Sequence, residues 1–104
     1  MRKAYQNAGL NPDEIDLIEC HGAGTPLGDK TELFSLSQMW QNINYKPGQC
    51  ALSSVKSMTG HLLTAAGMAG LIKTVLAMHN GPIPTSLNFR SPPPHTPSLT
   101  PGPF

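Results

Sequence analysis

The segment from His61 to Asn80 most constrains the fold, because it reads as a helix that is apolar nearly all round. Small residues at positions 65–67, 69 and 70 would let neighbouring backbone come close to it. Such a helix is buried on several sides. Thr64, Lys73 and Thr74 interrupt it, so it resembles a core helix more than a membrane span. Two short strands cannot cover it, and we therefore expect the 104-residue chain to be part of a larger domain.

The remaining elements predict an α/β fold. They alternate in the order helix, strand, helix, strand, helix, with parallel strands covered by helices. The expected elements are a helix that ends at Gly9, a strand over 15–20, a glycine-rich loop over 22–28, a helix capped by Asp29 with Glu32 three residues later, a strand over 50–55, and the helix His61–Asn80.

Charge and composition exclude several classes of partner. The formal net charge is +1 and no basic cluster occurs, so nucleic acid is not an expected partner. All six acids lie in residues 1–32, and residues 33–104 contain four bases and no acid. We interpret this acid-free stretch as a surface that contacts another protein segment or an anionic ligand. The N-terminus lacks the apolar stretch of a signal peptide, so we expect a cytoplasmic protein with reduced cysteines and no membrane contact.

The character of the chain changes after Gly81. Eight of the eleven prolines lie between Pro82 and the C-terminus, including three in succession at 92–94. We expect one partial domain over residues 1–90 and a proline-rich tail over 91–104 that runs extended over a surface.

Two histidines follow the two predicted strands. His21 comes after the first strand and precedes a glycine-rich loop, and His61 comes after the second strand, five residues beyond Lys56. At the start of a helix the dipole disfavours imidazolium, and the Lys56 ammonium acts in the same direction. A neutral imidazole that donates its N–H suits a carbonyl oxygen that gains negative charge. The alternative is that each histidine only caps backbone groups.

Other chemistries fit less well. The glycines between residues 22 and 28 do not have the spacing of a dinucleotide-binding loop, and no acidic residue follows at the end of a second strand. A zinc site would need Cys20 and His21, which are adjacent and point to opposite faces of a strand, so we expect no metal. Cys20 and Cys50 resemble buried hydrophobic residues more than nucleophiles. We assign no role to His79 or His95.

At these residues the chain resembles the β-ketoacyl synthases of fatty acid and polyketide synthesis, which share the thiolase fold. The family motif H-G-T-G-T-x-x-G-D-x-x-E appears as HGAGTPLGDKTE over 21–32, and K-S-N-x-G-H appears as KSMTGH over 56–61. The run A-A-G-x-A-G-x-I-K appears over 65–73, and IPTSLNF over 83–89 is similar to the family's I-P-P-x-x-N-F segment. Within this family, the motifs are most similar to those of multidomain type I synthases.

The resemblance implies the C-terminal half of a ketosynthase with a partial thiolase-like fold. In such enzymes malonyl on an acyl carrier protein loses CO₂, and its carbanion attacks an acyl thioester on a cysteine. His21 and His61 would stabilise the enolate oxygen, with Lys56 beside the second histidine, and Thr25 would contact the phosphopantetheine arm of the carrier. No cofactor is expected to bind directly. The positions expected to support the site are Asp29, Glu32, Gly22, Gly24 and Gly60.

Some family features are missing from this sequence. The acyl-accepting cysteine and the N-terminal half that carries it are absent. The resemblance therefore implies that this half is a partner of the segment. It also implies that the complete synthase forms a homodimer. Ala23 and Met58 replace a threonine and an asparagine of the motifs. We therefore expect the segment to be inactive alone. The alternatives are a degenerate ketosynthase-like element that docks a carrier or dimerises, and a thiolase-type enzyme, against which Lys56 and His61 argue.

Overall fold

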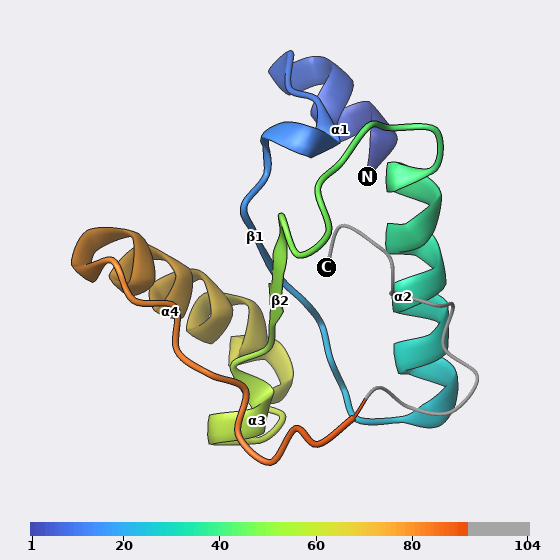
Figure 1. Cartoon of the computed structure of the whole chain (residues 1–104). Helices are drawn as coiled ribbons and strands as arrows, with labels where there is room; N and C mark the ends of the chain where they lie inside the picture. The colour runs from blue at the N-terminus through green and yellow to red at the C-terminus, as the bar shows by residue number, and fades with distance from the viewer. Residues whose placement is uncertain (92–104) are drawn as a thin grey trace.

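A computed structural model describes residues 1–91 of the chain. Its centre is a parallel two-stranded sheet of β1 (Leu17–Glu19) and β2 (Ala51–Ser53), with Leu17 paired to Ala51 and Glu19 to Ser53. The parallel arrangement that the sequence predicted is confirmed, although both strands are shorter than expected. Because parallel strands need a crossover, the chain passes through helix α2 (Pro26–Trp40) between them (Figure 1).

One face of the sheet packs on α2. Side chains alternate between the two faces of a strand, so Ile18 and Leu52 contact a buried cluster formed by this helix and the residue before β2. That cluster consists of Leu36, Met39, Trp40 and Cys50. The α2 helix begins at Pro26 with Thr25 as its N-cap residue, since proline already has the backbone angle of a first helical residue. The prediction that Asp29 caps the helix is therefore wrong: Asp29 lies in the first turn.

The opposite face of the sheet packs on α4 (Ala66–Asn80). Glu19 and Ser53 point toward this helix and meet Lys73. Gly70 allows the close approach, because a Cβ atom at this position would lie 3.1 Å from Cγ of Glu19. Helices thus cover both faces of the sheet, as an α/β fold requires.

Shorter elements complete the described chain. Helix α1 (Arg2–Ala8) ends at Gly9, which has the left-handed conformation expected of a helix stop, and a 3₁₀ turn η1 covers Pro12–Glu14. After β2 come α3 (Lys56–Thr59) and a 3₁₀ turn η2 (Leu63–Ala65) before α4. The predicted helix from His61 onward is therefore wrong at its start.

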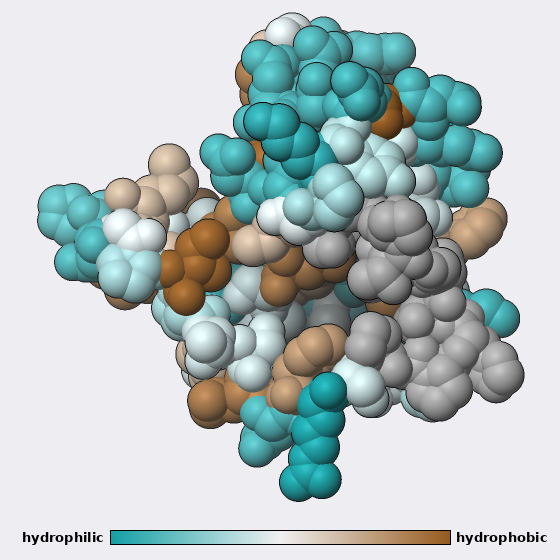
Figure 2. Space-filling model, in the orientation of Figure 1, coloured by the Kyte–Doolittle hydropathy of each residue, from teal (hydrophilic) through white to brown (hydrophobic). Residues whose placement is uncertain are grey.

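Much of α4 is not covered by the described residues. Its buried positions form one stripe, and apolar side chains such as Leu71, Ile72, Val75 and Leu76 are each more than half exposed. The sequence predicted burial on several sides, whereas only the side toward the sheet is buried here. Figure 2 shows hydrophobic residues at the surface between the end of α4, at the left of the view, and the strands.

An apolar groove of about 530 Å³ runs beside α4. It is lined by Val55, Met58, Thr59, Ala69, Ile72, Lys73, Leu76, Ala77, Asn80, Pro82 and Pro84. Within residues 1–91, no helix is both long enough and apolar enough to cross a bilayer. The predicted proline-rich tail over 91–104 lies outside the described residues, apart from its first position.

Candidate active site

The two histidines lie side by side at one edge of the sheet. His21 follows the carboxyl end of β1, and His61 lies between α3 and η2. Their ring centroids are 5.5 Å apart and the ring planes are nearly perpendicular, at 83°. Both side chains are exposed in this chain. Two residues that are 40 positions apart in the sequence are therefore placed where both can reach one small group.

The backbone at His21 is anchored by carboxylates of α2. The N–H groups of His21 and Gly22 donate to the two oxygens of Glu32, at 2.6 and 2.8 Å. Asp29 accepts from the N–H of Gly24 at 3.1 Å. Both acids thus hold the loop between β1 and α2. Hydrogen bonds from backbone donors to an ionised carboxylate are among the stronger ones in proteins, so this loop has a defined conformation.

Gly22 is required for both its conformation and its lack of a side chain. Its φ of +50° is one that other residues rarely adopt, and a Cβ atom here would lie 2.7 Å from Cβ of Ser54. The loops that follow the two strands therefore touch at this glycine. Gly24 also has a positive φ, of +73°, but the space around its missing Cβ is open.

Lys56 joins the two histidine segments through the main chain. Its ammonium donates to the carbonyl oxygen of His21 at 2.5 Å, and the hydroxyl of Ser54 donates to the same oxygen at 3.3 Å. The residue that follows β2 and the first residue of α3 therefore bind the backbone that carries the first histidine. The lysine that the sequence placed beside the second histidine contacts the backbone of the first.

His61 is oriented by a backbone N–H group instead of a helix dipole. Gly60, with φ of 73° and ψ of −177°, and Leu63, with φ of 49°, both interrupt helical geometry, so α4 begins only at Ala66. The N–H of Leu63 donates to Nδ1 of His61 at 3.0 Å. An imidazole that accepts at Nδ1 carries its proton on Nε2. Nε2–H is thus the donor that this histidine offers to a ligand.

The remaining positions singled out in the sequence are Thr25, Met58, His79 and His95. Thr25 is exposed at the start of α2, and its Oγ1 would lie 2.5 Å from a Cβ at Gly28, so that glycine makes room for the threonine side chain. Met58, on α3, lines the apolar groove. His79 is exposed near the end of α4, and His95 lies outside the described residues.

A hollow of about 360 Å³ begins at His21 and continues along α4. It is lined by Glu19, Cys20, His21, Val55, Lys56, Ala66, Gly67, Gly70, Leu71 and Thr74. The hollow lies at the carboxyl ends of parallel strands, where α/β proteins place their ligands.

The two cysteines have the chemistry of buried structural groups. Burial raises the pKa of the Cys20 thiol to about 12, and the Glu32 carboxylate acts in the same direction. Burial also raises the pKa of Cys50 to about 11, with Asp16 adding to the effect. Since the thiolate is the nucleophile, neither cysteine is suited to accept an acyl group.

Among residues 1–91, no three His, Cys, Asp or Glu side chains are grouped so as to hold a metal ion.

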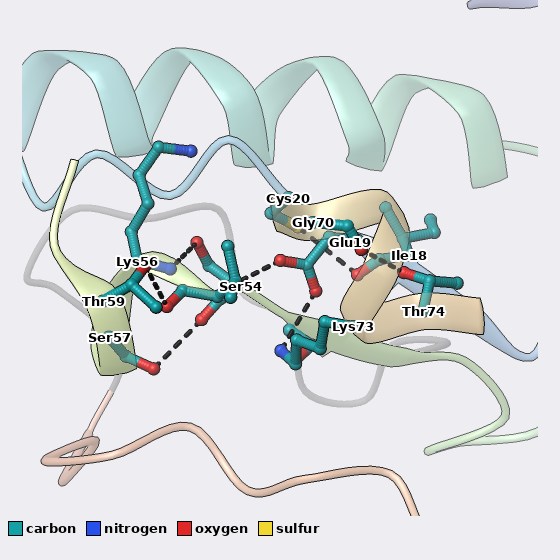
Figure 3. A network of polar contacts seen from close by, with 12 residues as sticks. Ile18, Glu19, Cys20, Ser54, Lys56, Ser57, Thr59, Gly70, Lys73 and Thr74 are labelled. Atoms are coloured by element: carbon teal, nitrogen blue, oxygen red, sulfur yellow. Dashed lines mark hydrogen bonds and ion pairs between the residues drawn. The ribbon is translucent and has the colours of Figure 1, made fainter. Parts of the chain in front are cut away.

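One polar cluster beside the histidines was missed in the sequence. Lys73 of α4 forms an ion pair with Glu19 of β1 at 3.0 Å and also donates to the hydroxyl of Ser53 (Figure 3). A signal existed: each charge stands alone inside an apolar segment, and a buried charge needs a partner. The 54 positions between them leave no local pattern that joins them.

Comparison with known proteins identifies the family. Residues 1–90 match the model of the β-ketoacyl synthase C-terminal domain. The chain is 48% identical over 95 residues to a phenolphthiocerol/phthiocerol polyketide synthase of Mycobacterium tuberculosis and 44% identical over 94 residues to a highly reducing polyketide synthase of Aspergillus terreus. These matches cover 91% and 90% of this chain but only 4% of either relative.

Solved structures agree with the sequence matches. The ketosynthase from module 1 of the bacillaene synthase of Bacillus amyloliquefaciens FZB42 superposes with a TM-score of 0.87 at 39% identity, covering 99% of this chain and 18% of that one. The ketosynthase from module 6 of the Bacillus subtilis 168 synthase gives 0.81 at 42% identity, covering 88% and 17%. The predicted thiolase-like α/β architecture, present in part, is confirmed. The chain belongs to the C-terminal domain family of the β-ketoacyl synthases.

Proposed function

We propose that this segment supplies the carbanion-stabilising half of a polyketide synthase ketosynthase. The observation that carries the proposal is the pair of imidazole rings, 5.5 Å apart at the carboxyl edge of a parallel sheet. The Nε2–H of His61, with its orientation set by Leu63, and a nitrogen of His21 would donate to one oxygen. Preorganised donors of this kind stabilise an oxygen that gains negative charge.

The reaction is a decarboxylative Claisen condensation. The C–C bond between the carboxylate and the α-carbon of a malonyl thioester breaks, CO₂ leaves, and the electron pair forms an enolate whose oxygen binds to the two histidines. The α-carbon then attacks the carbonyl of an acyl thioester on a cysteine, and the cysteine leaves as thiolate. Neither Cys20 nor Cys50 fits that role, because burial raises the pKa of both thiols. The acyl-bearing cysteine would lie outside this sequence.

The partners follow from the same proposal. The malonyl group arrives on the phosphopantetheine arm of an acyl carrier protein, with Thr25, exposed beside the histidine loop, as a contact for that arm. The complete synthase would act as a homodimer in the cytoplasm. Polyketide synthesis is favoured over fatty acid synthesis by the relatives, which are polyketide synthases.

Replacement of His61 tests the proposal in a full-length synthase that contains this segment. The variant His61→Ala should lose release of CO₂ from malonyl carrier protein by about 10²–10³-fold, the effect of removing one oxyanion donor. Transfer of the acyl group to the enzyme should remain measurable. His79→Ala, which removes an exposed histidine of α4, is the matched control and should leave both steps unchanged.

The same experiment separates catalysis from a binding role. Ala23 and Met58, which replace polar residues of the family motifs, favour a second function as a non-catalytic element that docks a carrier protein. That function requires the unaltered synthase to bind malonyl carrier protein without releasing CO₂. Such an outcome would contradict the proposed condensation.

A further inference from the structure

The ion pair between Glu19 and Lys73 is nearly enclosed between the sheet and α4. Lys73 Nζ lies 3.0 Å from Glu19 Oε2, and the two side chains are only 8% and 14% exposed. Removing two charges from water is costly, and a buried pair is by itself weak evidence for a gain in stability. The contacts that the pair makes with the rest of the site therefore indicate what it does.

The second oxygen of Glu19 reaches the other histidine segment. Oε1 accepts the N–H of Val55 at 2.5 Å. Val55 is the N-cap residue of α3, directly before Lys56. Glu19 is itself two positions before His21. One carboxylate, at the end of the strand that precedes His21, therefore binds the start of the segment that carries Lys56 and His61 (Figure 3).

Two residues of α4 surround the carboxylate of Glu19 and make this contact possible. Lys73 binds Oε2 of Glu19 and also donates to the hydroxyl of Ser53 on β2. Gly70, one turn earlier on α4, leaves the space that Glu19 fills: a Cβ there would lie 3.1 Å from Cγ and 3.5 Å from Oε1. Gly70 thus leaves room for Oε1 to reach Val55, and Lys73 on the same face of the helix balances the charge of the carboxylate.

We propose that Glu19 is a positioning residue for the histidine pair and that Lys73 balances its buried charge. This inference rests on the proposed function. The hydrogen bond from Val55 to Glu19 sets the start of α3, and therefore the place from which Lys56 reaches the carbonyl of His21. If that start shifts, His61 moves relative to His21. Displacement of a catalytic group by about 1 Å costs on the order of 10²-fold in rate.

Two double variants of the full-length synthase separate positioning from simple stabilisation. Glu19→Gln with Lys73→Met removes both buried charges but keeps an oxygen that accepts the N–H of Val55. Glu19→Leu with Lys73→Met also removes both charges and leaves that N–H without an acceptor. Neither variant leaves a single buried charge behind, so both avoid the main cause of misfolding. Melting temperature and acyl loading report whether each variant is folded.

The Gln variant should release CO₂ from malonyl carrier protein within about threefold of the unaltered rate, and the Leu variant should lose on the order of 10²-fold. Acyl loading should remain near normal in both. A folded Leu variant with undiminished CO₂ release would overturn the inference. If the Leu variant fails to fold, the Gln variant alone tests the inference. A folded Gln variant with a large loss of CO₂ release would then overturn the inference. Failure of the proposed function is distinguishable, because the unaltered synthase would then release no CO₂.

Discussion

Gly22 and Gly24 lie two positions apart in the loop after β1 and differ in what surrounds them. Both have positive φ, but only Gly22 faces another residue, Ser54, at a distance that a Cβ atom cannot tolerate. Gly24→Ala should therefore lower the free energy of unfolding by about 1–2 kcal/mol through backbone strain. Gly22→Ala adds an overpacked contact and should lower it by about 2–5 kcal/mol.

Urea denaturation of the folded ketosynthase measures this difference. The comparison of the two alanine variants isolates the contact with Ser54, since the conformational cost is shared. Equal losses in the two variants would show that the loops after β1 and β2 do not approach each other as closely as described.

The two thiols make the free energy of unfolding depend on pH in the alkaline range. Burial raises the pKa of Cys20 from 9.0 to about 12 and that of Cys50 from 9.0 to about 11. Well below pH 9 both states of the chain hold most of the thiol protons, and the thiols contribute little to any change of stability with pH. Above pH 9 the unfolded chain releases these protons first, so the free energy of unfolding should fall from pH 9 up to about pH 12.

Alkylation with iodoacetamide at pH 8 provides a second readout of the thiols. Because the folded thiols are less ionised, they should react about 10²–10³-fold more slowly than in urea. Equal rates in the folded and unfolded protein would contradict the partial burial of Cys20 and the burial of Cys50. The outcome would then reopen the assignment of a nucleophile within this chain.

Glu32 connects two elements, because its side chain leaves α2 and binds the backbone that follows β1. Glu32→Gln keeps one acceptor oxygen but turns an N–H₂ group toward a backbone N–H. This change should lower the free energy of unfolding by about 1.5–3 kcal/mol. Asp29→Asn is the matched control: Asp29 accepts a single N–H, from Gly24, and an amide oxygen can replace that acceptor, so the loss should stay below about 1 kcal/mol.

Thermal and urea unfolding of both variants test the role of α2 as an anchor. If Asp29→Asn proves as harmful as Glu32→Gln, the bidentate contact with His21 and Gly22 has no special weight. The His21 loop would then be held mainly from the side of Lys56 and Ser54.

The elements were predictable to the extent that local patterns determine them. Alternating short apolar runs and helical spacing indicated the strands and the parallel order, and the glycine at position 9 marked the end of α1. The start of the last helix was not predictable in this way. The sequence from His61 to Ala65 is as compatible with helix as the residues of α4 are. The interruption comes from Leu63, whose positive φ accompanies the hydrogen bond to His61.

The site could be predicted from the sequence only in part, because many of its contacts join residues that are far apart in the chain. The motif resemblance pointed to His21, His61 and Lys56, and the structure brings them together. It could not show that Lys56 binds the carbonyl of His21, nor that Glu19 and Lys73 pair. Such contacts depend on how helix, strand and turn pack, which no short run of residues encodes.

Across the whole molecule, the exposed apolar side of α4 predicts how the 104-residue chain behaves by itself. Leu71 and Val75 are 56% and 53% exposed and lie one turn apart, so they share a face. An apolar surface of this kind favours association. The purified chain should therefore form oligomers, and Leu71→Glu with Val75→Glu should shift it toward monomer.

Size-exclusion chromatography with light scattering measures the effect. His79→Glu adds a charge to an exposed polar position of the same helix and should leave the association unchanged. If the unaltered chain is monomeric, the exposed apolar side of α4 does not drive association, and the prediction is wrong.

The turn between α2 and β2 lies at the other end of the sheet from the histidines. It leads into the first residue of β2, whereas Lys56 and His61 follow the last one. Gly48 in this turn is exposed, and nothing lies within 4 Å of the place where its side chain would begin. Exposed loop tips accept added sequence best. A fluorescent label or peptide tag inserted at Gly48 would therefore leave the edge of the sheet that carries the histidines untouched.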